Sequence, residues 1–139
     1  MIGKPSEEIL ERIIETIPFE ISALDENDNV LMWNKHETRI FKRPEAALGR
    51  NVRKCHPQKS LEKVEQILNE MKENKREKAT FWIDLPIGKN NSIRKVMIQY
   101  LAIRDKDGNY LGCLEASQDI TDIQKMEGNK RLLDKGESI

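Results

Sequence analysis

Hydrophobic and polar residues follow two different periods along this chain, and the two periods predict its helices and strands. Apolar residues recur every three or four positions over 6–17 and again over 61–72, a spacing typical of amphipathic helices. Each of these segments begins at a serine, Ser6 or Ser60, a residue type that favours helix N-caps. We therefore expect two amphipathic helices, the first of which ends before Pro18.

Two further segments, 19–23 and 80–85, alternate with a period of two, which is the pattern of half-buried strands, and we expect five strands in all. They are residues 19–23, 30–33, 80–85, 93–103 and 110–118. The last two are joined by a turn in which Asp107 and Gly108 supply the positive φ that a tight hairpin needs. Residues 34–57 are irregular and predict short helices and loops. This order predicts an α+β fold, a five-stranded antiparallel sheet with the middle helices packed on one face and a cavity between them.

The two ends of the chain are expected to flank this core. We divide the chain into an N-terminal flanking helix (1–17), a domain core (18–120) and a charged C-terminal linker or output helix (121–139). The apolar stripe that runs from Ile9 to Ile17 is larger than an isolated helix leaves bare. We expect it to pack on the sheet or on a second subunit, so that a homodimer forms.

Composition narrows the class of function. The 139 residues include 24 Lys+Arg and 24 Asp+Glu, and a net charge of zero does not favour nucleic acid as the main partner. The apolar runs are far shorter than the ~20 residues of a membrane span, and Cys55 and Cys113 are too few for a disulfide framework. We expect a cytoplasmic domain that binds neither nucleic acid nor membrane. No Gly-rich phosphate loop, nucleophile elbow or HExxH motif occurs, so we predict that the chain is not an enzyme.

Four short motifs, in this order, resemble those of the PAS domain family. They are the hairpin 23–34 with its closing Asn34, the segment 40–52 with its Gly49, the pair His56-Pro57 before the long helix, and Asp119-Ile120-Thr121 after the last strand. Residues 54–60 are similar to the PAS modules that accompany haemerythrin-like domains in anaerobic prokaryotes. The resemblance implies a ligand cavity, dimerisation through flanking helices and signal transfer to a neighbouring domain of a longer protein.

Cys55 and His56 are adjacent side chains that bind metals, and they lie just before the helix that lines the cavity in PAS domains. Either is a candidate haem-iron ligand, and because consecutive side chains point apart we expect one ligand rather than two. The alternative interpretation is that His56 caps a turn beside Pro57 while Cys55 packs as a small apolar residue. Flavin is less favoured than haem, because the Asn-Cys-Arg-Phe motif of light-sensing PAS domains is absent. The identity of the cofactor or ligand stays open.

Several strand residues are further candidates for the cavity wall. They are Trp82, Met97, Tyr100, Leu101, Cys113 and Leu114. Alternation alone does not fix the register of a strand, so the pattern does not decide which of them face inward. Three polar strand positions, Gln99, Glu115 and Ser117, are expected to face solvent on the open side of the sheet.

The sequence therefore predicts a sensory module that binds a small ligand or cofactor, haem among the candidates, between sheet and helices. A change at this site would pass through the flanking helices to a neighbouring domain. Two alternatives stay open. One is a protein interaction or dimerisation module without a ligand, and the other is a thiol redox switch that uses Cys55 and Cys113.

Overall fold

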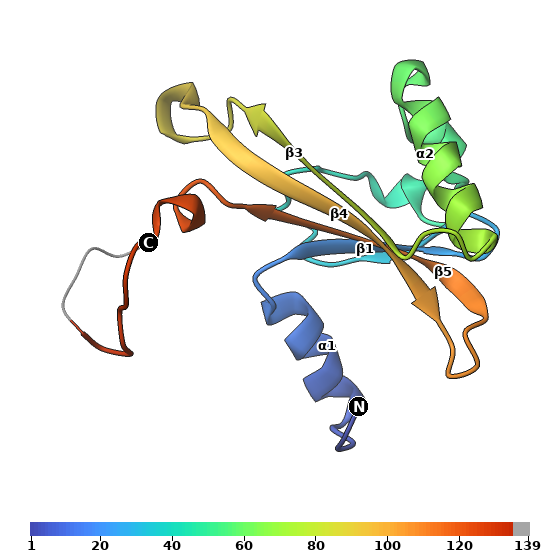
Figure 1. Cartoon of the computed structure of the whole chain (residues 1–139), viewed down its shortest axis with the longest axis horizontal. Helices are drawn as coiled ribbons and strands as arrows, with labels where there is room; N and C mark the ends of the chain where they lie inside the picture. Colours follow the sequence, from blue (N-terminus) through green and yellow to red (C-terminus); the bar gives the residue numbers. More distant parts are fainter. Residues whose placement is uncertain (135–139) are drawn as a thin grey trace.

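A single antiparallel sheet and two α-helices make up most of the computed structural model, which describes residues 1–134 (Figure 1). The elements are α1 (Glu7–Thr16), β1 (Glu20–Asp25), β2 (Val30–Trp33), α2 (Gln58–Lys72), β3 (Lys78–Leu85), β4 (Arg94–Arg104) and β5 (Tyr110–Asp119). Short 3-10 helices lie at η1 (Glu45–Ala47), η2 (Val52–Lys54), η3 (Lys89–Asn91) and η4 (Ile123–Lys125). The strand order is β2-β1-β5-β4-β3, which confirms the predicted five-stranded α+β fold.

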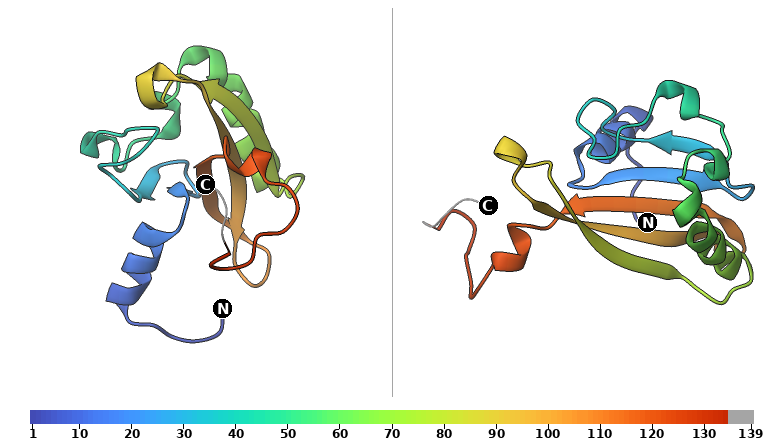
Figure 2. Two further views of the ribbon diagram at one scale, coloured as in Figure 1. Left: turned by 90° about the vertical axis from the view of Figure 1, so that its left-hand side faces the viewer. Right: turned by 90° about the horizontal axis from the view of Figure 1, so that it is seen from above.

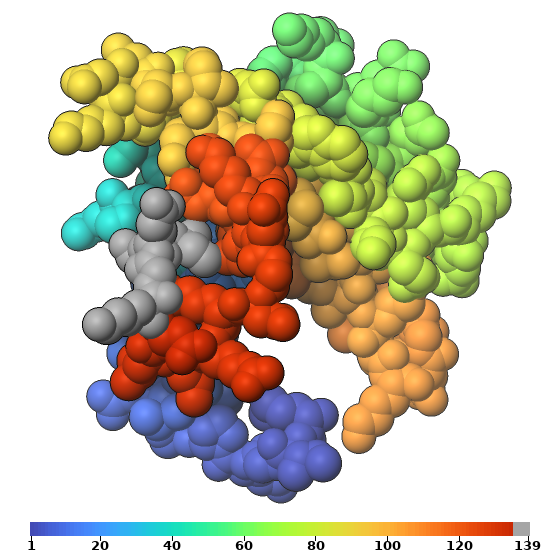
Figure 3. Space-filling view, turned by 60° about the vertical axis from the view of Figure 1, so that its left-hand side comes forward, coloured from blue at the N-terminus to red at the C-terminus, as the bar shows by residue number. Residues whose placement is uncertain are grey.

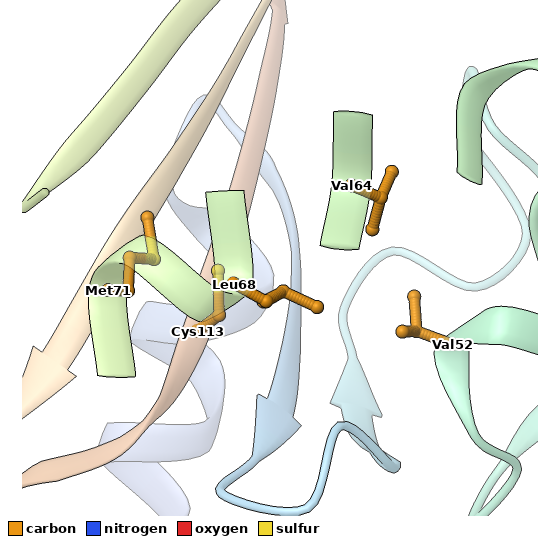
Figure 4. Close-up of a cluster of buried hydrophobic side chains, with 5 residues drawn as sticks. All are labelled: Val52, Val64, Leu68, Met71 and Cys113. Atoms are coloured by element: carbon orange, nitrogen blue, oxygen red, sulfur yellow. The ribbon is translucent and has the colours of Figure 1, made fainter. Parts of the chain in front are cut away.

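The long α2 helix packs across one face of the sheet, next to β5 (Figure 2). Its apolar stripe supplies Val64, Leu68 and Met71 to a buried cluster that also contains Val52 from η2 and Cys113 from β5 (Figure 4). Burial of each such side chain stabilises the fold by about 1.5–3 kcal/mol, so this cluster fixes the helix to the sheet. The candidate site also lies between α2 and the sheet.

The α1 helix forms as its sequence predicts, but it does not pack against the sheet. The Ser6 hydroxyl accepts a hydrogen bond from the Ile9 backbone N–H at 3.2 Å, which caps the helix. None of its residues is buried, and Ile9 and Ile13 are 51% and 47% exposed. Figure 3 shows α1, in blue, projecting from the molecule, with open space between it and the β4–β5 hairpin in orange. Ile9 and Ile13 are therefore left about half exposed by the described part of the chain, whereas Leu10, Ile14 and Ile17 are partly buried.

Two expectations about helices need correction. The α2 helix begins at Gln58 with Pro57 as its N-cap residue, and the hydroxyl of Ser60 donates to the Pro57 carbonyl instead of capping the helix. Up to residue 134, the C-terminal segment contains only the single 3-10 turn η4, so the predicted C-terminal flanking helix is absent from this described part. Its few, widely spaced apolar residues do not support a longer helix. The rest of the predicted linker, 135–139, lies outside the described residues.

No helix in residues 1–134 is both long enough and apolar enough to cross a membrane.

Candidate ligand-binding cleft

A cleft of about 690 Å³ lies between α2 and the sheet, a volume within the usual range of small-molecule sites. Its apolar lining comes from α2 (Val64, Ile67), β3 (Phe81, Ile83), β4 (Ile98, Tyr100), Phe41 and Pro57. Its polar lining is Lys42, Arg43, Cys55, His56, Ser60, Lys63 and Glu115. A smaller inner cavity of about 20 Å³ shares Arg43, His56, Tyr100 and Glu115 with the cleft. Its volume is enough for about one water molecule.

The shared wall contains an ion pair between Arg43 and Glu115. Arg43 Nη2 lies 3.1 Å from Glu115 Oε2 and 3.3 Å from the hydroxyl oxygen of Ser22, on the neighbouring strand β1. The two charged side chains are only 15% and 19% exposed, so they attract each other in a medium of low polarity. Arg43 Nε is fully buried and has no hydrogen-bond partner among the described residues.

A second, fully buried ion pair positions the loop that carries Arg43. Arg39 Nη2 lies 3.2 Å from Glu20 Oε2, and the carboxylate of Glu20 also accepts the backbone N–H groups of Ile40 and Phe41 at 2.6 and 3.1 Å. Arg39 Nε in turn donates to the Phe41 carbonyl at 2.9 Å. These contacts fix the irregular segment after β2 against β1, and they place Phe41 and Arg43 on the cleft wall.

His56 and Cys55 lie at the junction of η2 and α2, and both line the cleft. The Cys55 backbone N–H donates to the Val52 carbonyl, and its Sγ lies 3.7 Å from the Asn51 carbonyl oxygen. Burial lowers the pKa of His56, against the Glu115 carboxylate, which raises it. The imidazole is therefore neutral at physiological pH, the form in which a histidine could bind a metal ion. This donor chemistry fits one protein ligand to a haem iron, and whether His56 or Cys55 binds any cofactor stays a prediction.

Cys113 and Tyr100 face the same side of the sheet but are unsuited to ionise. Burial raises the pKa of the Cys113 thiol to about 12, and it also raises the pKa of the Tyr100 hydroxyl. Both groups therefore stay protonated at neutral pH. Cys113 lines only the inner cavity and belongs to the apolar core.

Four of the residues proposed for the cavity wall lie on the opposite face of the sheet. Trp82, which is 62% exposed, pairs with Met97, and Leu101 pairs with Leu114, whereas the neighbours Phe81 and Tyr100 line the cleft. Because successive side chains of a strand point to opposite faces, Trp82, Met97, Leu101 and also Leu114 lie away from α2. Their assignment to the wall is therefore corrected.

The expectation that the polar strand positions face solvent is also wrong in part. Ser117 is buried, and Glu115 faces the cleft, where Arg43 balances its charge. Gln99 lies on the other face and its side-chain amide donates to Thr80 at 3.3 Å. Neither Glu115 nor Ser117 faces solvent as expected. Their partners come from distant parts of the chain, which period-two alternation does not reveal.

The end of β5 is fastened to the beginning of β4. Arg94 Nε donates to Asp119 at 2.8 Å and its Nη2 to Asp122 at 3.1 Å. Thr121 accepts the Lys95 backbone N–H through its hydroxyl at 2.7 Å. The segment that follows β5 is thus held by the Arg94 side chain and the Lys95 backbone of β4, a strand that also lines the cleft.

The fold agrees with comparisons to known proteins. A model of the family described as PAS domain matches residues 10–121, more than half of the chain. The chain belongs to the PAS domain family. Among curated proteins, no sequence matches this chain.

Solved structures show the same fold. A C-terminal domain from Streptococcus mutans is 29% identical to this PAS domain with a TM-score of 0.81, and the match covers 91% of this chain and 94% of that one. The PAS domain of a Colwellia psychrerythraea protein is 20% identical with a TM-score of 0.59, covering 83% and 97%. The PAS domain of BvgS from Bordetella pertussis is 19% identical with a TM-score of 0.59, covering 82% and 85%.

Proposed function

We propose that this PAS domain is a sensory module that binds a small organic molecule in the cleft between α2 and the sheet. The observation that carries the proposal is the cleft itself. It has a volume of about 690 Å³, its walls are mainly apolar, and the partly buried Arg43–Glu115 pair provides polar groups at one place on them. Sites for small molecules usually combine an apolar cavity with a few such convergent polar groups.

The route of the signal follows from the contacts of the site. Glu115 lies in the middle of β5, and β5 continues to Asp119, which Arg94 holds. A ligand that alters the contacts of Glu115 would shift the equilibrium of β5 and of the segment after it. We propose that this segment passes the change to a neighbouring domain of a longer cytoplasmic signalling protein.

A variant that fills the cleft tests this function. Ile67 of α2 lines both cavities, so Ile67→Trp should occupy the cleft with an indole ring. We expect the neutral apolar dye N-phenylnaphthylamine to bind the wild-type protein saturably, one to one, with a fluorescence increase. Ile67→Trp should weaken this binding by about tenfold or more, which corresponds to about 1.4 kcal/mol. The matched control is Ile93→Trp, because Ile93 is exposed and does not line the cleft.

The outcomes separate this function from its alternatives. If the wild type gives no saturable dye signal, or if both tryptophan variants bind like the wild type, the cleft is not a ligand site. A ligand-free interaction module would then be the better interpretation. In parallel, an anaerobic haem titration of the wild type and of His56→Ala and Cys55→Ala tests haem as the occupant. A Soret band that shifts in one variant would identify the ligand of the iron.

The thiol redox switch has less support than ligand binding. A reactive cysteine needs thiolate character and access to solvent, whereas Cys113 is buried and its pKa is raised to about 12. Cys55 is only partly buried, but one accessible thiol does not form a disulfide with a partner inside the core. The burial of Cys113 in the apolar cluster favours a packing role for it.

We also propose that the module works as a homodimer through α1. A helix of 10 residues is marginal in water on its own, and α1 leaves the apolar side chains of Ile9 and Ile13 half exposed. We expect the wild type to sediment as a dimer at micromolar concentrations and Ile13→Glu to sediment as a monomer. The control Ile123→Glu, which changes another exposed isoleucine, should stay dimeric. A monomeric wild type at high concentration contradicts the proposal.

A further inference from the structure

One edge of the Arg43 guanidinium group is incompletely hydrogen-bonded. The Nε and Nη2 atoms lie on the same edge of a guanidinium plane, an edge that matches the two oxygens of a carboxylate. In this edge Nη2 donates to Glu115 and Ser22, while Nε is fully buried and has no partner among the described residues. A buried N–H group without an acceptor is unfavourable, so a rearrangement of the Arg43–Glu115 contact that brings an oxygen atom to Nε would be favourable.

The other charges of the cleft also favour a negative ligand. Lys42, Arg43 and Lys63 line the cleft, and Glu115 is the one carboxylate in its lining. His56 adds no charge, because burial lowers its pKa. The cleft therefore has an excess of positive charge around an otherwise apolar space. A molecule with several charges would place some of them against the aromatic and aliphatic walls, at a high desolvation cost.

We infer that the cleft binds a molecule with an apolar body and a single carboxylate, and that this carboxylate binds the Nε–Nη2 edge of Arg43. The inference rests on the proposed function of the cleft and names its ligand class. The apolar body lies between α2 and the β3–β4 side chains Phe81 and Ile98. The carboxylate competes with Glu115 for Nη2, so that binding releases Glu115 from Arg43. This competition connects the presence of the ligand to the centre of β5, which pairs with β1 at Ser22 and with β4 at Tyr100.

A displacement assay with three eight-carbon compounds tests the head group separately from the cleft. N-phenylnaphthylamine is bound to the wild-type protein near neutral pH and is titrated with octanoate, octanol or octylamine, which share one apolar chain. We expect octanoate to displace the dye at a concentration about tenfold or more lower than octanol, and octylamine to be the weakest. If octanol displaces the dye as well as octanoate does, or if octanoate displaces none, the carboxylate inference is wrong although the cleft still binds the dye. If the dye itself does not bind, the proposed function fails first.

Variants of the ion pair give the inference a second test. Arg43→Met should weaken the binding of octanoate by about tenfold or more and change the binding of octanol by less than about twofold. Glu115→Gln should strengthen the binding of octanoate by about threefold or more, because the side chain that competes for Arg43 has lost its charge while Arg43 remains. A purely structural role of the pair predicts that both variants weaken octanoate and octanol together, and that result would overturn the inference. Arg12→Met, at an exposed position of α1 outside the cleft, serves as the charge-matched control.

Discussion

Replacing Arg39 by methionine should lower the free energy of unfolding by about 3–5 kcal/mol, measured by urea denaturation. The side chains of Arg39 and Glu20 are only 2% and 5% exposed. If one partner of this ion pair is removed, water cannot solvate the charge of the other. Arg39 also donates to the backbone carbonyls of Ile21, Asn34 and Phe41. Burial lowers the pKa of its guanidinium, but arginine remains protonated in proteins, so the native site always contains this cation. Without it, the Glu20 carboxylate is left buried and unbalanced.

Two further variants show whether the loss comes from the unbalanced charge. Arg12→Met removes an arginine that is 63% exposed, and it should change stability by less than about 0.5 kcal/mol. The double variant Arg39→Met with Glu20→Met should recover only part of the loss. The uncompensated carboxylate is gone, but the backbone N–H groups of Ile40 and Phe41 have lost their acceptor. A stability of Arg39→Met within about 1 kcal/mol of the wild type would contradict this account of the buried pair.

The predictable part of the fold is the part that depends on local pattern. Alternation over 80–85 predicts a strand that the structure has as β3 (Lys78–Leu85), and Asp107 and Gly108 predict the β4–β5 turn, where Gly108 has a φ of 86°. These signals are local because a strand that is buried on one face repeats every two residues and a tight turn needs particular backbone angles. The error at Ser60 is also local in origin. Both Pro57 and Ser60 are suitable near a helix N-terminus, and composition does not decide between starts that are three residues apart.

The site was harder to predict because its residues are brought together by contacts between distant segments. Arg43 and Glu115 are separated by 72 positions, and neither lies in a motif that points to the other. Alternation over 80–85 sets Phe81 and Ile83 against Trp82, but because all three are apolar it does not show which set faces the cleft. The position of His56 on the cleft wall was suggested by resemblance to a family, not by a pattern in this sequence. The register of each strand and the partner of each side chain determine the site, and both depend on tertiary contacts.

Replacing Gly112 by alanine should destabilise the domain by about 3 kcal/mol, at the upper end of the range for overpacking substitutions. Gly112 is buried in β5, where it pairs with Asp25 of β1 and Ile103 of β4. A Cβ atom at this position would lie 2.1 Å from the Leu24 carbonyl oxygen and 3.2 Å from the carbon to which that oxygen is bonded. Both atoms belong to the backbone, so no side chain can rotate away. The alanine methyl group would therefore push β1 away from β5, two neighbouring inner strands of the sheet.

Gly108→Ala separates this steric effect from the loss of glycine's conformational freedom. Gly108 has a positive φ, but an added Cβ would meet no atom within 4 Å. Its substitution should therefore lower the free energy of unfolding by only the ~1–2 kcal/mol that an alanine costs in the left-handed backbone conformation. We expect Gly112→Ala to show the larger loss in urea denaturation and to increase hydrogen exchange of the β1 amides that pair with β5. Equal losses for the two variants would mean that β1 and β5 adjust without strain. Because β1 supplies Ser22 and β5 supplies Glu115, a separation of these strands should also weaken octanoate binding, which links the packing of the sheet centre to the chemistry of the cleft.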